Sequence, residues 1–168
     1  MQLNTLNDVL EEQLIDLYSA EQQLIQALPK MAQAASNQEL RQAFETHLQE
    51  TRGHFERLQE LLPTLGIQAG GETCEAMQGL IKEGDKIVQS QGDPTAKDAA
   101  LIAAAQRVEH YEIAAYGTAR TLAGQLDLDD AKDILDQTLD EEAHADKLLT
   151  TIATGGFFKT GVNEQAAR

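Results

Sequence analysis

The chain has 168 residues, of which 42% are hydrophobic and only 4% aromatic, and its formal net charge is −15. So large a negative charge argues against nucleic acids and anionic membrane surfaces as partners, because both would repel the protein. Cys74 is the only cysteine, which excludes an intrachain disulfide and a thiolate metal cluster.

Hydrophobic residues recur at the helical period through most of the chain, and they are mostly Leu, Ala and Ile. We predict an all-α fold in which a bundle domain spans residues 1–155 and a loose tail spans 156–168, with Phe157 and Phe158 as candidates for docking on the bundle. Pro29 should kink the first helix rather than end it. The third helix is shorter and is expected to cross over one edge of the bundle. The predicted helices are 4–35, 37–63, 72–91, 95–125 and 129–154.

The first predicted helix carries a carboxylate at a position where its apolar pattern predicts leucine. Its buried stripe is expected to include Leu14, Leu17 and Leu24, and Glu21 lies on the same line. A lone buried charge costs several kcal/mol unless it is paired or bound to a metal. Taken alone, a glutamate in mid-helix is more often a surface residue, so the other helices decide its role.

The other long helices carry matching acids at mid-length on their inner faces. Residues three or four apart share a helix face, and Glu21 and Glu50 lie at comparable depths if the first two helices are antiparallel. His54 falls on the inner stripe of the second helix, whereas we place His47 outside the ligand set. We prefer Glu142 to Glu141 as the inward acid. Tyr18 and Tyr116 are candidates for hydrogen bonds to the ligands, with core packing as the favoured role. The candidate metal ligands are Glu21, Glu50, His54, Glu109, Glu112, Glu142 and Asp146.

Several carboxylates in a dry core repel one another, so they require cations. Carboxylate oxygen with imidazole suits iron or manganese better than structural zinc, which prefers tetrahedral nitrogen and sulfur ligands. The few aromatic residues leave little to stack an organic cofactor. The sequence therefore predicts a metal site at the centre of the bundle.

Two pairs of helices resemble copies of one hairpin. Glu21 and Glu50 are 29 residues apart, and Glu112 and Glu142 are 30 residues apart. We therefore expect the first and second helices to match the fourth and fifth, with the third helix between the two hairpins.

Five segments resemble the YciF-type family of ferritin-like stress proteins, and the run Val-Glu-His-Tyr-Glu-Ile-Ala at 108–114 is the most specific of them. The resemblance covers residues 3–153. It implies a ferritin-like bundle with a rubrerythrin-like helix arrangement, a homodimer and an association with bacterial stress responses. The segments are 18–24, 47–53, 76–81, 99–114 and 138–142.

We predict two metal ions in this bundle, iron with manganese as the second candidate. Glu50 and Glu142 are expected to bridge them, and a small oxidant such as peroxide or oxygen is the expected substrate. The chain departs from the usual Glu-x-x-His spacing of di-iron carboxylate bundles, because Gly53 and Ala145 stand where the histidines would be. Two alternatives stay open: a structural or interaction protein in which metal only stabilises the bundle, and an iron-storage cage.

The sequence also carries expectations about location. No apolar run approaches the roughly 18 to 20 residues that a membrane span needs. The first residues lack the basic and apolar regions of a signal peptide. We therefore expect a cytoplasmic protein without a membrane partner.

Overall fold

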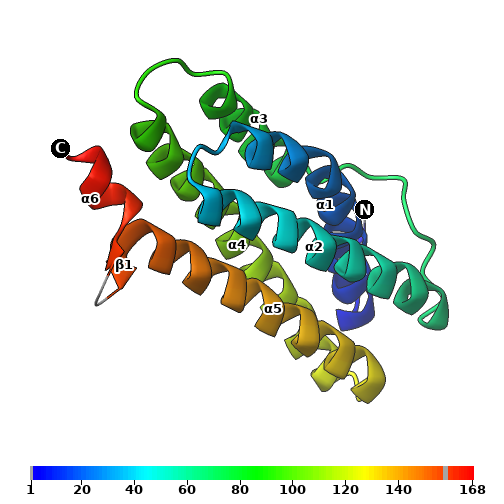
Figure 1. Ribbon diagram of the computed structural model, residues 1–168. Helices are drawn as coiled ribbons and strands as arrows, with labels where there is room; N and C mark the ends of the chain where they lie inside the picture. The colour runs from blue at the N-terminus through cyan, green and yellow to red at the C-terminus, as the bar shows by residue number, and fades with distance from the viewer. Residues whose placement is uncertain (1, 157–158) are drawn as a thin grey trace.

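The computed structural model describes residues 2–156 and 159–168. Within them, four long helices form a bundle in which α1 lies beside α2 and α4, and α5 lies beside α2 and α4 (Figure 1). The shorter α3 packs across α1 and α4 on one edge. This arrangement confirms the predicted ferritin-like four-helix bundle with a crossover helix. The elements are α1 Leu6–Ala34, α2 Gln38–Thr64, α3 Glu75–Val88, α4 Pro94–Gln125, α5 Asp129–Thr154, β1 Gly155–Gly156, β2 Lys159–Thr160 and α6 Val162–Ala166.

The helix ends lie within three residues of the predicted ones. Side-chain caps explain this agreement: Asn37 accepts from the backbone N–H groups of Glu39 and Leu40 at the start of α2, and Asp93 caps α4. The helix α1 runs through Pro29, as expected.

The apolar core consists of two clusters separated along the bundle axis. One cluster packs Leu24 and Phe44 with Met77 of α3 and Leu101 of α4. The other packs leucines of α1, α2 and α5 around Tyr116. The middle of each long helix, between the two clusters, is where the inward polar residues lie.

The C-terminal residues correct the prediction of a loose tail. Gly155 ends α5 with a φ of 76°, a conformation that favours glycine, and β1 pairs with β2 as an antiparallel hairpin. The hairpin returns the chain to the bundle, where α6 packs on α4 and α5 and Val162 is 1% exposed within the core. The predicted docking of Phe157 and Phe158 lies outside the described residues.

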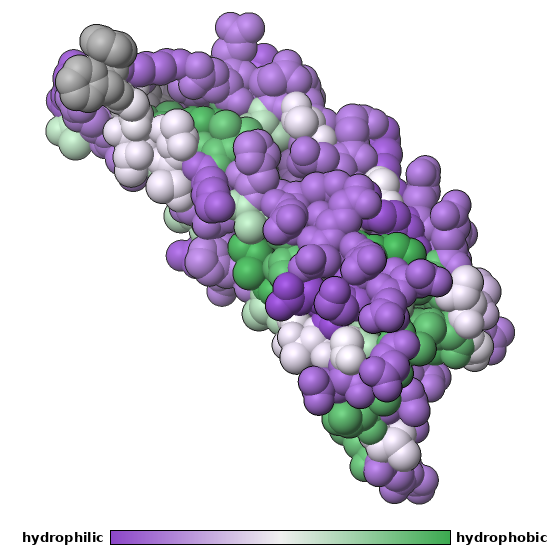
Figure 2. All heavy atoms as spheres, turned by 90° about the horizontal axis from the view of Figure 1, so that it is seen from below, coloured by the Kyte–Doolittle hydropathy of each residue, from purple (hydrophilic) through white to green (hydrophobic). Residues whose placement is uncertain are grey.

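The described surface is mainly polar. Figure 2 shows the molecule from below the view of Figure 1, and on this face hydrophilic residues surround separate apolar patches. Leu3, Leu6 and Leu148 are the large hydrophobic side chains exposed in the described part of the chain. None of the described helices combines the length and the apolarity that crossing a membrane would demand.

Candidate metal centre

Six polar side chains from the four long helices meet between the two apolar clusters. None of them is more than 5% exposed. The two on α2 are seven residues apart and the two on α4 are three apart, so each pair projects from one helix face. They are Glu21 of α1, His47 and His54 of α2, Glu109 and Glu112 of α4, and Glu142 of α5.

These side chains form two groups whose ligand atoms lie within 4.8 Å of one another. Glu142 belongs to both groups: its Oε1 is 2.8 Å from Nδ1 of His54, and its Oε2 is 3.6 Å from Nε2 of His47. A carboxylate that turns one oxygen toward each group is placed to bridge two cations. The first group is His47, Glu109, Glu112 and Glu142, and the second is Glu21, His54 and Glu142.

The cluster consists of four carboxylates and two imidazoles. Four carboxylates and two imidazoles are also what the usual pattern of two Glu and two Glu-x-x-His motifs supplies. Here the imidazoles come from one helix, α2, and neither follows a glutamate ligand by three residues. Two divalent cations would balance the four carboxylate charges.

The cluster also contains all the unpartnered polar atoms found buried in the described part of the chain. Eight side-chain nitrogen and oxygen atoms there make no hydrogen bond of adequate geometry, and they belong to these six residues. Both carboxylate oxygens of Glu112 are among them. The contacts among the eight atoms, such as that of Nδ1 of His54 with Oε1 of Glu142, are those of charge pairs. Buried polar groups are normally hydrogen-bonded, and each exception costs about 1–3 kcal/mol or more when charged. The residues present therefore fit a bound metal.

Both imidazoles are held from outside the cluster by a carboxylate. Nδ1 of His47 lies 3.4 Å from Oε2 of Glu50, and Nε2 of His54 lies 2.9 Å from Oε2 of Glu141. These contacts leave Nε2 of His47 and Nδ1 of His54 facing the centre. A carboxylate on the outer nitrogen fixes the tautomer and orientation of a metal-binding histidine.

Glu21 is positioned by a tyrosine, and His54 also lies 3.4 Å from this carboxylate. The hydroxyl of Tyr116 donates to Oε1 of Glu21 over 2.6 Å, and both side chains are fully buried. This hydrogen bond leaves Oε2 of Glu21 free to face the centre. Tyr116 therefore takes the ligand-bonding role, the alternative to the core packing favoured from the sequence, whereas Tyr18 packs against Phe55, as favoured.

Burial and mutual repulsion make the metal-free cluster retain protons. Burial raises the pKa of Glu109 and Glu112 well above the usual value, and the charge of Glu142 adds to this for Glu112. Burial alone would lower the pKa of His47, but the charges of Glu109 and Glu142 outweigh it and raise the pKa to about 10. For His54, the nearby Glu142 and Glu21 overcome burial and raise the pKa to about 10. The protons belong to the cluster as a whole.

The metal-free protein is expected to lose stability as the pH rises from about 6.5 to about 10. The unfolded chain releases the imidazole protons at the lower end of this interval, whereas the folded chain keeps them until the upper end. The raised pKa values of Glu109 and Glu112 also make the stability of the metal-free protein fall as the pH rises. Urea titrations of chelator-treated protein across this interval measure the free energy of unfolding, and an increase with pH would contradict the assignment.

Of the residues predicted from the sequence, the structure brings together Glu21, His54, Glu109, Glu112 and Glu142. It does not place Glu50 or Asp146 in either group. Glu50 lies on the outer side of His47 with 32% of its side chain exposed.

Asp146 accepts a hydrogen bond from Gln106 over 2.9 Å and lies 3.4 Å from His110, which is exposed. His47 enters the cluster although the sequence analysis placed it outside. Its position on the same inner stripe as Phe44, Thr51 and His54 was the signal that could have identified it.

Comparison with known proteins agrees with this fold. The chain matches DUF892, a domain of unknown function, over residues 5–167. It is 45% identical to the Escherichia coli K12 protein YciF over 165 residues, which cover 98% of this chain and 99% of that protein.

Two solved structures are similar over most of the chain. The E. coli stress protein YciF superimposes with a TM-score of 0.85 at 47% identity, covering 88% of this chain and 94% of the other. YcfI from Rhodopseudomonas palustris, described as a proposed structural protein, superimposes with a TM-score of 0.86 at 44% identity. The match covers 90% of this chain and 97% of YcfI. The chain therefore belongs to the DUF892 family and is a homologue of the stress protein YciF.

Proposed function

We propose that the chain is a ferritin-like stress-response protein that holds a dinuclear metal centre in its bundle, with iron as the metal and manganese as the second candidate. The observation that carries this proposal is the set of eight unpartnered buried atoms on six converging side chains. Relatedness to a stress protein supports the physiological context.

Glu142 belongs to both groups of side chains and would hold both metals. The other five ligands would divide between the two metals, His47, Glu109 and Glu112 on one side and Glu21 and His54 on the other. The two apolar clusters cover the centre toward the two ends of the bundle.

Iron held in such a site supplies redox and Lewis-acid chemistry toward peroxide or oxygen. The residues around the centre orient the ligands, and the cluster itself retains protons when no metal is bound. Tyr116 fixes one oxygen of Glu21, and Glu141 fixes the outer nitrogen of His54. Arg57 pairs with Glu141 and so keeps that carboxylate charged and in place, with a lowered pKa.

Iron-loaded protein is expected to consume hydrogen peroxide, and Glu112→Gln is expected to lose most of this activity because it removes a carboxylate with two free oxygens. Peroxide consumption by wild type, by Glu112→Gln and by the surface control Glu45→Gln provides the measurement. An inert wild type with a full complement of iron would contradict a reactive centre.

That inert result would favour a second candidate, a structural protein whose metal only stabilises the bundle. The similarity to YcfI favours considering it, since that neighbour is described as a proposed structural protein. The homodimer is part of our proposal in either case, and light scattering coupled to size-exclusion chromatography tests it.

A further inference from the structure

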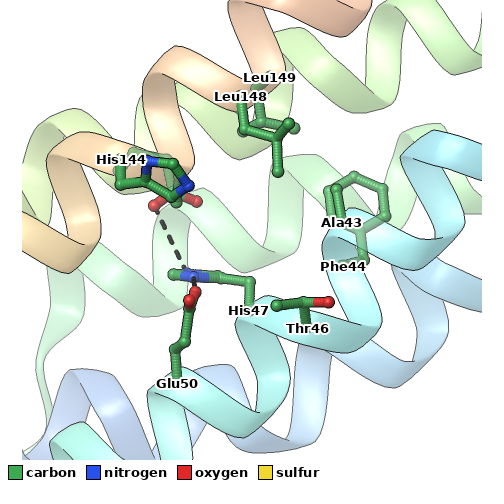
Figure 3. Close-up of a pocket in the computed structure, with 10 residues that line it drawn as sticks. Ala43, Phe44, Thr46, His47, Glu50, His144, Leu148 and Leu149 are labelled. Carbon is green, nitrogen blue, oxygen red and sulfur yellow. Dashed lines mark hydrogen bonds and ion pairs between the residues drawn. The ribbon is translucent and has the colours of Figure 1, made fainter.

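An opening between α2 and α5 leads from the surface to the candidate metal centre. It has a volume of about 50 Å³. Thr46, His144 and Leu148 form its rim, and His47 and Glu109 form its floor. Figure 3 shows His144 and Leu148 of α5 facing Thr46 and His47 of α2 across this opening. On the floor, Nε2 of His47 and Oε2 of Glu109 are buried 3.4 Å apart, and neither atom makes a hydrogen bond.

Glu50 lies on the wall of this opening and spans the distance between solvent and floor. Its side chain is 32% exposed, and its Oε2 is 3.4 Å from His47. No lysine or arginine within the described residues pairs with it. Glu141, the corresponding carboxylate outside His54, is neutralised by an ion pair with Arg57. The two outer carboxylates therefore differ: Glu141 is paired with an arginine, whereas the partner of the partly exposed Glu50 is the imidazole of His47.

The geometry points to this opening as the entry route for divalent cations, with Glu50 as the carboxylate that captures the ion and passes it to His47 and Glu109. The inference rests on the proposed metal centre. From solvent inward, the ligands are the carboxylate of Glu50, the imidazole of His47 and the carboxylate of Glu109. An ion can therefore bind the next ligand before it leaves the previous one. The net charge of −15 concentrates cations around the protein, and Glu50 directs them to one point.

The chemistry of the ligands along the opening adds selectivity. An entering cation must release water and take protein ligands in its place. Mg²⁺ dehydrates reluctantly, whereas Mn²⁺, Fe²⁺ and Co²⁺ accept carboxylate and imidazole ligands readily.

The test follows Co²⁺ loading of chelator-treated protein by the visible absorption of the bound ion, in a stopped-flow instrument. Glu50→Gln is expected to slow loading by about tenfold and to reach the same final cobalt content as wild type. Thr46→Trp, which fills the rim, is expected to slow loading as well. The matched controls are Glu45→Gln, which removes an exposed charge elsewhere on α2, and Gln49→Trp, which adds an exposed indole outside the opening; both should load within about twofold of wild type.

Loading of Glu50→Gln at the wild-type rate would overturn the entry route. A lower final cobalt content in this variant would also overturn it, because Glu50 would then be needed for retention rather than entry. Failure of the proposed centre itself is distinguishable, since in that case wild type would take up no cobalt at all. Circular dichroism of each variant confirms that rate differences come from folded protein.

Discussion

Saturating Mn²⁺ is expected to raise the melting temperature of the metal-free protein by about 10 °C or more. A ligand at about one hundred times its dissociation constant stabilises the folded state by about 2.7 kcal/mol per site. Two sites give roughly 5 kcal/mol, and a chain of this size gains about 2–4 °C per kcal/mol. The source of this stabilisation is that bound cations balance the four buried carboxylates, several of whose oxygens make no hydrogen bond, in place of the protons that the metal-free cluster retains.

The matched variant for this measurement is Glu112→Gln. It keeps the size of the side chain but removes one buried acid from the cluster, so the metal-free variant is expected to melt above metal-free wild type. It should gain little from Mn²⁺. Glu45→Gln controls for the loss of a surface charge. Equal shifts in wild type and Glu112→Gln would show that Mn²⁺ acts somewhere other than this cluster.

Replacing Asp98 by alanine is expected to destabilise the protein by about 3–5 kcal/mol. Asp98 is 1% exposed on α4, and its carboxylate accepts the backbone N–H groups of Ser36 and Asn37 over 2.8 Å each and the hydroxyl of Ser36. It thereby ties the turn between α1 and α2 to a third helix. Alanine would leave these partly buried donors without their acceptor, at the start of α2 where Asn37 is also the cap.

Urea denaturation of Asp98→Ala and Asp98→Asn measures this effect. The asparagine variant keeps one acceptor oxygen and should lose less stability than alanine. Asp93→Ala, which removes an exposed helix cap on the same helix, should cost about 1 kcal/mol and serves as the control. A loss below that of Asp93→Ala would mean that the turn does not depend on Asp98.

The helices could be predicted from the sequence because their signals are local. Leucine periodicity, the caps Asn37 and Asp93, and the Gly155-Gly156 pair each act within a few residues. The structure at the end of the chain could not be predicted from the sequence. The helix α6 is short, and it is stabilised by Val162, which packs in a core built by distant helices. A five-residue helix has no periodicity of its own to detect.

The candidate site was predictable in outline because acids interrupt an apolar stripe. Glu21, Glu112 and Glu142 are fully buried on such stripes. Spacing alone could not predict that His47, rather than Glu50, enters the cluster. The two residues differ by about 60° around α2, and a long side chain can cover that angle in either direction. Asp146 lies one turn, about 6 Å, along α5 from Glu142, and Gln106 holds it there.

The most direct test of the account is the metal content of protein purified without chelator, measured by inductively coupled plasma mass spectrometry on wild type and on Glu112→Ala. We expect two transition-metal ions, iron or manganese, per wild-type chain. The variant loses a buried carboxylate with two unpartnered oxygens and should retain less than half of this amount. Wild type that carries no metal, and that takes up none when iron or manganese is supplied, would contradict the central claim.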